Sequence, residues 1–193
     1  MLTPKLFALG GFAAGLVLIV AGLGSAVVGY QGRVDVRDTL AQEQIIAPDD
    51  SRIPGQLVNT GDRARAQAEI IREHQLARTG GLMYAEMGRF ATEDGNPAGT
   101  NNAEAAAIGP NGNPLPNTAR DGWITATALI TALETAYFAE QVGNFAMLIG
   151  LALFLTGVGL TVLTAAAILR VPAFRTEEEE APAGTEGHAA PAA

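Results

Sequence analysis

The sequence predicts an all-α membrane protein: an antiparallel hairpin of two transmembrane helices, with helical extracytoplasmic extensions and a long, partly disordered loop. Two uncharged and mostly apolar runs, residues 6–29 and 141–169, predict the spans. At a rise of about 1.5 Å per residue, a helix of either length exceeds the roughly 30 Å hydrocarbon thickness of a bilayer. Inside lipid the backbone must satisfy its own hydrogen bonds, so both runs are expected to be helical.

The segment between the two runs, residues 30–140, is acidic. It holds nine Arg and fifteen Asp or Glu. This balance argues against a nucleic-acid partner, whose phosphates need a basic surface. The sequence has no Cys, which excludes disulfides, thiolate metal sites and thiol nucleophiles. Serine occurs only at Ser25 and Ser51, which weakens a serine-hydrolase interpretation.

The basic residues near the runs predict the orientation of the chain. Arg170 and Arg175 follow the second run, whereas Arg120 is the nearest basic residue before it. Because Lys and Arg are enriched in cytoplasmic segments, the C-terminus is expected in the cytoplasm, and an even number of spans places the N-terminus there too. The sequence thus predicts a multi-pass protein of the plasma membrane, with a cytoplasmic N-terminus (1–5), an extracytoplasmic loop (30–140) and a disordered acidic cytoplasmic tail (170–193).

The first run has an alternative interpretation as a cleaved signal peptide. Gly24-Ser25-Ala26 offers small residues at which a peptidase could cut, so that residues 1–26 would be removed. The apolar core of a signal peptide is typically about 7–15 residues long. The first run is longer than that, which favours its retention as a transmembrane helix.

Helices are expected to extend from the first span into the loop. The first helix meets no breaker until Pro48, which removes an amide donor and restricts the residue before it. A second helix is expected over residues 63–78, which are rich in helix formers. Thr60 or Asp62 can cap its beginning, and Gly80-Gly81 is a typical end signal.

The second half of the loop is expected to be less regular. Residues 82–87 predict another turn or two of helix. Residues 92–117 are rich in Gly, Asn, Pro and Ala, and such a segment cannot bury enough apolar surface to offset its ordering entropy. We therefore expect a flexible loop there. Asp121 can then cap a long helix that passes straight into the second run.

Small residues recur every seven positions along both runs. Seven residues are close to two helical turns, so each set lines one side of its helix. Close backbone approach at small residues drives helix association in lipid, which favours packing over the alternative that Gly is simply common in this chain. The residues predicted to make the contact, within one chain or between copies, are Gly11, Gly15, Gly22, Ala26, Gly29, Gly143, Gly150, Gly157 and Thr164.

No residue is predicted to be catalytic, to bind a cofactor or to hold a metal. The runs contain no Asp, Glu, Lys, Arg or His, the groups that proton relays and substrate pathways in membranes usually need. The two histidines, His74 and His188, are expected on opposite sides of the membrane and cannot share a metal. Asp49-Asp50, with Asp35 and Asp38 upstream, could offer carboxylates to Ca²⁺. The spacing lacks the alternation and the Gly of an EF-hand loop, which favours a solvated turn.

Three central segments resemble a known group of proteins. Residues 66–76 read AQAEIIREHQL, residues 79–87 read TGGLMYAEM, and residues 44–50 read QIIAPDD. Together with the two apolar runs, these segments resemble small actinobacterial two-span membrane proteins of unknown function, which are often labelled aromatic ring-opening dioxygenase. The resemblance covers most of the chain except residues 92–117 and the tail, and it implies the same two-span topology.

The expected function is that of an accessory or scaffolding subunit of the cell envelope. Its expected partners are the lipid bilayer and either a second copy or another membrane protein. An extracytoplasmic sensor or ligand-binding module, with helices from both spans around a ligand, is the alternative. A dioxygenase is disfavoured, because one extracytoplasmic histidine cannot supply the common two-His-one-carboxylate iron site within one chain.

Overall fold

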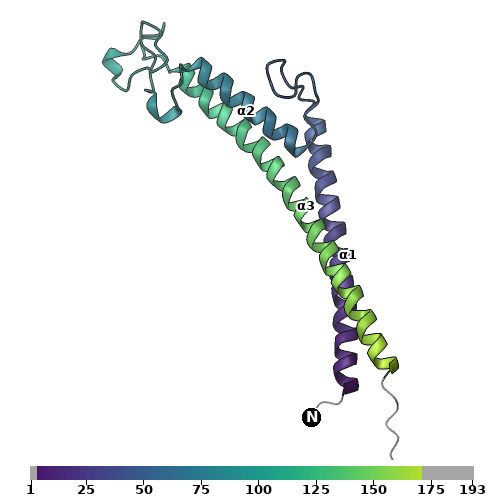
Figure 1. Cartoon of the computed structure of the whole chain (residues 1–193). Helices are drawn as coiled ribbons and strands as arrows, with labels where there is room; N and C mark the ends of the chain where they lie inside the picture. The colour runs from purple at the N-terminus through teal and green to yellow at the C-terminus, as the bar shows by residue number, and fades with distance from the viewer. Residues whose placement is uncertain (1–3, 171–193) are drawn as a thin grey trace, which may run out of the picture.

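The computed structural model describes residues 4–170, and within this range the chain is all-helical with no β-strand (Figure 1). The predicted all-α class is thus confirmed. The long helices are α1 (Pro4–Gln42), α2 (Gly61–Arg78) and α3 (Thr118–Arg170), and two short 3₁₀ turns, η1 (Tyr84–Glu86) and η2 (Ala103–Ala105), lie between α2 and α3. Two of these helices, α1 and α3, are long and apolar enough to cross a membrane.

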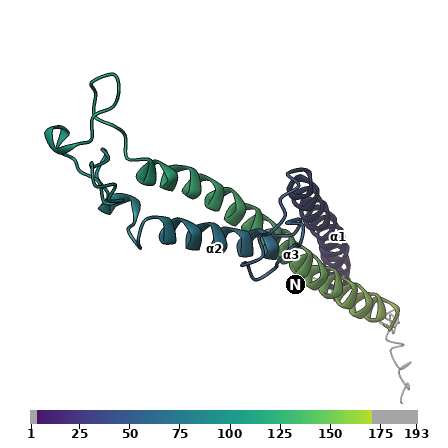
Figure 2. The same cartoon turned by 90° about the horizontal axis from the view of Figure 1, so that it is seen from above.

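Helix α3 is the longest element of the fold, and each of the other two long helices packs against one half of it. At about 1.5 Å per residue, its 53 residues extend for about 80 Å. Helix α1 lies antiparallel to the C-terminal half of α3, and α2 lies beside the N-terminal half (Figures 1 and 2). The chain is therefore elongated, and α2 takes the place of α1 beside α3 where α1 and α3 separate. We call the part in which α2 packs on α3 the arm.

A closed loop connects α1 to α2 at the point where α2 replaces α1 beside α3. Helix α1 ends at Gln42, and Ile46 and Leu57 then form an antiparallel bridge. The amide of Val58 donates to the carbonyl of Ile45 at 2.8 Å, so the two ends of the loop are joined. Ala47 and Val58 are buried. The loop thereby carries the chain from the end of α1 back to the side of α3.

Helix α2 begins and ends close to the expected positions. Thr60 is its N-cap, and its hydroxyl accepts a hydrogen bond from the amide of Arg63 at 3.4 Å. At the other end, Gly80 and Gly81 have φ angles of 64° and 88°, which side chains disfavour. The amide of Gly81 donates to the carbonyl of Leu76 at 2.8 Å, which satisfies a free carbonyl of the last turn.

The hydrophobic core lies along the arm, outside the two apolar runs. Trp123 is 3% exposed, and its indole nitrogen donates to the carbonyl of Leu82 at 2.9 Å, so the ring is both packed and hydrogen-bonded. The small residues Ala64 and Ala68 of α2 allow close packing of α2 against α3. The buried cluster comprises Leu40, Ala47, Val58, Ala64, Ala68, Met87, Trp123, Ala126, Ile130 and Leu133.

The start of α3 differs from the prediction, because Asn117 and not Asp121 caps the helix. The Asn117 side-chain oxygen accepts hydrogen bonds from the amides of Ala119 at 3.1 Å and Arg120 at 3.4 Å. Asp121 lies within the first turn of α3 instead. A carboxylate there still suits the positive end of the helix dipole.

The predicted flexibility of residues 92–117 stays a prediction, but the structure shows how this segment is held locally. The structure gives this segment, which we call the head together with residues 82–91, a defined set of backbone hydrogen bonds. Phe90 forms bridges with Thr100 and Pro116, and Ile108 with Pro114. Polar side chains also accept from amides two residues ahead, as at Asp94, Asn96, Asn102 and Asn111. These local bonds replace much of the apolar burial that the composition cannot provide.

The predicted segments at the two ends of the chain are described only in part. Residues 4 and 5 belong to α1, and the helix α3 continues to Arg170. The expected disordered acidic tail, with His188, lies outside the described residues except for Arg170.

Candidate functional site

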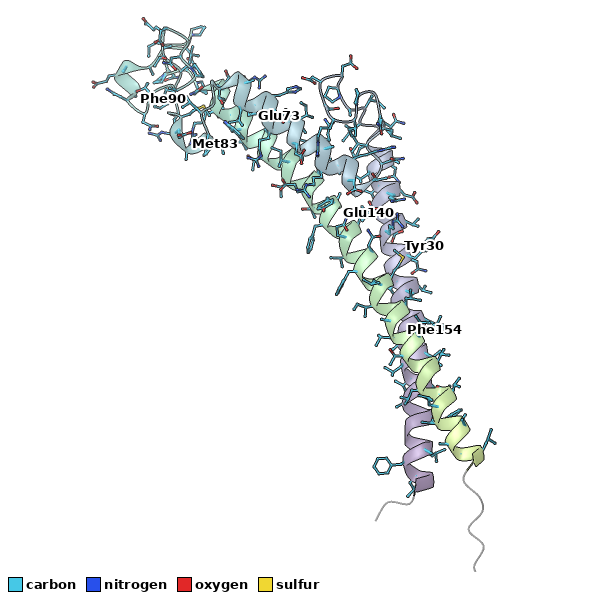
Figure 3. All side chains as sticks on the ribbon, in the orientation of Figure 1. Tyr30, Glu73, Met83, Phe90, Glu140 and Phe154 are labelled. Atoms are coloured by element: carbon cyan, nitrogen blue, oxygen red, sulfur yellow. The ribbon has the colours of Figure 1, made fainter. Side chains whose placement is uncertain are left out.

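The glycines predicted to pack lie on the contact between α1 and α3. Within residues 6–29 and 141–169, all of which the structure describes, the buried residues are all glycines. Many large apolar side chains of both helices are instead exposed, such as Val20 of α1 and Leu151 of α3 (Figure 3). We call this contact the glycine seam; its buried members are Gly15, Gly22, Gly29, Gly143, Gly150 and Gly157.

The seam glycines face one another in three levels. Gly15 lies opposite Gly157, Gly22 opposite Gly150, and Gly29 opposite Gly143. A Cβ atom on Gly22 would lie 2.5 Å from the Phe154 amide nitrogen and 2.6 Å from the Gly150 carbonyl oxygen. These are backbone atoms and cannot move out of the way as a side-chain end can. The backbones of the two helices therefore approach as closely as only glycine allows.

The remaining residues predicted for this contact lie beside the same seam. A Cβ on Gly11 would lie 2.6 Å from Cγ2 of Thr164, and one on Gly150 would lie 2.6 Å from the amide nitrogen of Ala26. The hydroxyl of Ser25 also donates to the carbonyl of Ala146 at 2.9 Å, from one helix to the other. The structure thus brings all nine predicted residues to one contact within a single chain.

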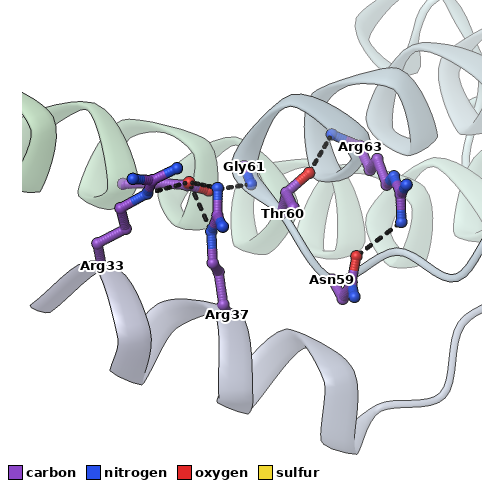
Figure 4. Close-up of polar contacts among 7 residues, drawn as sticks. Arg33, Arg37, Asn59, Thr60, Gly61 and Arg63 are labelled. Carbon is purple, nitrogen blue, oxygen red and sulfur yellow. Dashed lines mark hydrogen bonds and ion pairs between the residues drawn. The ribbon is translucent and has the colours of Figure 1, made fainter. Parts of the chain in front are cut away.

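At the end of the seam nearest to α2, one carboxylate joins all three long helices (Figure 4). Glu140 of α3 is 4% exposed. Its Oε1 accepts from Arg37 Nε at 2.8 Å, from Arg37 Nη2 at 2.6 Å and from Arg33 Nε at 3.1 Å. Its Oε2 accepts a short hydrogen bond from the amide of Gly61, the first residue of α2. Figure 3 shows this junction at the level where α1 and α3 begin to separate.

The sequence explains why the junction forms there. Arg33 and Arg37 are one helical turn apart in α1, just beyond the first apolar run, and Glu140 directly precedes the second. Antiparallel packing along the seam brings these residues level. A Cβ on Gly61 would lie 3.0 Å from both Glu140 Oε2 and Tyr137 Cα, so glycine permits the approach of α2. The free amides and positive dipole at the start of α2 favour the negative charge.

The charge of Glu140 is well compensated. Burial by itself raises the pKa of this carboxyl, but the hydrogen bonds from Gly61, Arg37 and Arg33 together bring the pKa below its ordinary value. Glu140 lies outside the run 141–169, and with its pKa lowered it is a carboxylate at neutral pH.

Acid is expected to open this junction. A carboxyl with a lowered pKa in the folded state contributes stability above its unfolded pKa and loses it as the pH falls through the folded value. The first turn of α2 should become less protected in hydrogen exchange below about pH 4, relative to neutral pH. A Glu140→Gln variant should lack this part of the pH dependence; an equal response in both proteins would contradict the assignment.

A groove of about 810 Å³ lies next to the junction, on the side of the head. The last turns of α1, one side of α2 and the facing part of α3 form its walls. Its walls are mostly apolar, with acidic residues on the α1 edge. A smaller hollow of about 430 Å³ continues it along α2 and α3, since Ile71 and Leu129 line both. The groove is lined by Asp35, Val36, Thr39, Leu40, Glu43, Ile45, Gln67, Ile71, Leu129, Ala132, Leu133, Thr135, Ala136 and Ala139.

The carboxylates and the histidine considered in the sequence form no shared centre. His74 Nε2 lies 2.7 Å from Asp50 Oδ2, and both side chains are exposed. This hydrogen bond is the main cause that lowers the pKa of Asp50. Exposed pairs of this kind contribute little to stability. Among residues 4–170, no group of three or more His, Cys, Asp or Glu is placed to hold a metal ion.

Asn117 fixes the head to the arm. Besides capping α3, its side-chain nitrogen donates to the carbonyls of Gly88 at 3.1 Å and Pro97 at 2.9 Å. The residue is 3% exposed. One side chain therefore connects three separate segments of the backbone.

Replacing Asn117 with alanine is expected to release the head. The variant loses the cap of α3 and leaves two carbonyls without their donor, a loss of about 2 kcal/mol. Limited proteolysis should then cut within residues 88–116 more readily than in the parent chain. Asn111→Ala serves as the control, because Asn111 is exposed and makes only a local turn bond. Equal cutting of both variants would contradict this role.

Comparisons with protein-family models, with curated proteins and with solved structures gave no match to this chain.

Neither the junction nor the groove was predicted from the sequence. Arg33, Arg37 and Glu140 were given no role there. The available signal was their position: an Arg pair one turn apart after the first run, and a Glu directly before the second. The groove left no comparable signal, because it depends on where α1 separates from α3.

Proposed function

We propose that this chain is an integral protein of the plasma membrane whose two spans anchor an extracytoplasmic helical arm. Both termini are cytoplasmic in this proposal, and α1 and α3 cross the bilayer as an antiparallel hairpin. The exposed apolar side chains of residues 6–29 and 141–169 support it, since lipid can cover them. The glycine seam supports it as well, because small residues at the contact are typical of helix pairs in membranes.

The arm serves as an accessory or scaffolding subunit that holds a partner protein beside the membrane. The observation that carries this proposal is the continuity of α3, which extends from the membrane segment to the head as one helix of 53 residues. Helices α1 and α2 support it in turn, and the Glu140 junction connects them. Such an arm can fix the position of a bound protein relative to the bilayer.

The test is photo-crosslinking of the full chain in its native membranes. A photoreactive amino acid is placed at Ile108 of the head, which is 55% exposed, or at Leu129 of the arm, which is 50% exposed. A purified, crosslinked product of constant stoichiometry is the expected result, and mass spectrometry identifies it. A chain that forms no product from either position, and that does not associate with itself in detergent, would contradict the scaffolding role.

A ligand-binding or sensing module is the second candidate. The apolar groove favours it, because its volume of about 810 Å³ lies within the roughly 300–1,000 Å³ of small-molecule sites. A signal would then have to reach another protein through the spans.

A further inference from the structure

The groove above the junction exists because α1 and α3 diverge there. Below Glu140 the two helices are in backbone contact, and above it α2 fills only one side of the opening. Leu40 and Leu133 form part of its buried floor, while Leu129, on the α3 wall, is half exposed. An apolar strip thus remains open between helices that already pack on one another.

The shape of the groove fits a helix better than a small molecule. Many of its lining residues are exposed, including Thr39, Glu43, Ala132 and Thr135. A small molecule is typically about 70–90% buried in its site, which an open trough does not provide. An amphipathic helix instead places one apolar face in a groove and leaves its other face in water. The groove and its continuation together follow α3 from Ala139 back to Gly122. This distance of 17 residues corresponds to about 26 Å of helix.

Charge along the groove gives the occupant a direction. In the part of the groove next to the junction, the charged lining residues are Asp35 of α1 and Glu43 just after its end, and both are exposed. Its distal continuation is lined by the cationic Arg78 and by His74, which already pairs with Asp50. Basic side chains are therefore favoured at the membrane-proximal end of the occupant. The buried Gln67 Oε1, which accepts no hydrogen bond from the described residues, offers an acceptor in the same wall.

A second copy of this chain fits these charges poorly. Two copies in one membrane are related by an axis along the membrane normal, so that like ends of their grooves meet. Asp35 and Glu43 of one copy would then approach the same two residues of the other. Like charges that face one another across an interface are unfavourable.

We propose that the groove binds an amphipathic helix of a partner membrane protein, whose membrane-proximal end carries basic side chains that pair with Asp35 and Glu43. This inference rests on the proposed scaffolding function and names the contact through which a partner is held. The apolar face of the helix packs on Leu40, Leu129 and Leu133. The seam and junction hold both walls of the groove in place.

Binding is measured with the purified full chain in nanodiscs of zwitterionic lipid. The chain has no Cys, so a Thr39→Cys variant carries a single environment-sensitive fluorophore at the groove edge. The probes are two synthetic helical peptides of about 18 residues with the same leucine stripe. One has lysines beside the stripe at one end, and the other has glutamates there. Empty nanodiscs measure the binding of each peptide to lipid, which is subtracted.

The lysine peptide is expected to bind at least about tenfold more tightly than the glutamate peptide. Ala132→Trp, which fills the groove, should abolish binding, whereas Ala128→Trp on the same helix outside the lining should not. Asp35→Asn together with Glu43→Gln should remove most of the preference for lysine. Glu134→Gln, an exposed acid that does not line the groove, should leave it unchanged.

Three results would overturn the inference. Equal binding of both peptides would remove the role of charge, and binding that persists in a folded Ala132→Trp variant would place it elsewhere. Self-association of the chain that Ala132→Trp disrupts would assign the groove to a second copy. If the peptides fail to bind but crosslinking from Ile108 still captures a partner, the scaffolding function stands and only the groove assignment is wrong.

Discussion

Replacing Gly22 with leucine is expected to force α1 and α3 apart within the apolar runs. The new side chain would begin 2.5 Å from the amide nitrogen of Phe154, so the backbones themselves must separate. Inserting a larger side chain into a packed contact typically lowers the free energy of unfolding by about 1–3 kcal/mol. We expect a loss at the upper end of that range, because the clash here is with the backbone. Thermal unfolding in detergent, followed by circular dichroism and by resistance to protease, measures the loss.

The matched control for this prediction is Gly24→Leu. Gly24 lies on the same helix two residues away, and a Cβ placed there meets nothing within 4 Å. The same comparison can be made on α3 between Gly157 in the seam and Gly159 outside it. If the leucine at position 22 or 157 is tolerated as well as that at 24 or 159, the seam does not hold the pair together.

Replacing Glu140 with alanine is expected to detach the start of α2 from α1 and α3. The variant leaves Arg33 and Arg37 without their shared carboxylate and the amide of Gly61 without its acceptor. Removing one partner of a buried ion pair typically costs about 3–5 kcal/mol, and the partial exposure of both Arg side chains reduces this to about 2–3 kcal/mol here. Hydrogen exchange over residues 57–66 should become markedly faster.

Two further variants show whether this effect belongs to the junction. Glu134→Ala removes an exposed acid six residues earlier on α3 and should leave hydrogen exchange unchanged. Glu140→Gln keeps one acceptor for Gly61 but loses the charge, so its effect should be intermediate. An exchange rate at the start of α2 that is the same in the parent chain and in Glu140→Ala would refute the role of this residue.

The sequence was sufficient for the helical class and the position of the two apolar helices. Their length and lack of charge are local properties, as are the end signals Thr60 and Gly80-Gly81 of α2. The period of seven in the glycines also placed the seam residues on one face of each helix. The glycine face of α1 then pairs with that of α3, because the two helices are antiparallel.

The sequence was not sufficient for features that depend on distant partners. Asn117 caps α3 because its other atoms reach Gly88 and Pro97, and no local pattern distinguishes it from Asp121. The local hydrogen bonds of residues 92–117 were also not predicted, because composition measures apolar burial, whereas side chains such as Asp94 and Asn102 satisfy backbone amides. The groove follows from the angle at which α1 leaves α3.

The membrane hairpin is the central claim, and cysteine accessibility in intact cells tests it most directly. Since the chain has no Cys, single-cysteine variants Glu73→Cys in α2 and Ala189→Cys near the C-terminus report on one site each. A membrane-impermeant maleimide is expected to label Glu73→Cys in intact cells, and to label Ala189→Cys only after the membrane is opened. Labelling of both variants in intact cells, or of Ala189→Cys alone, would contradict two spans with a common cytoplasmic side for both termini.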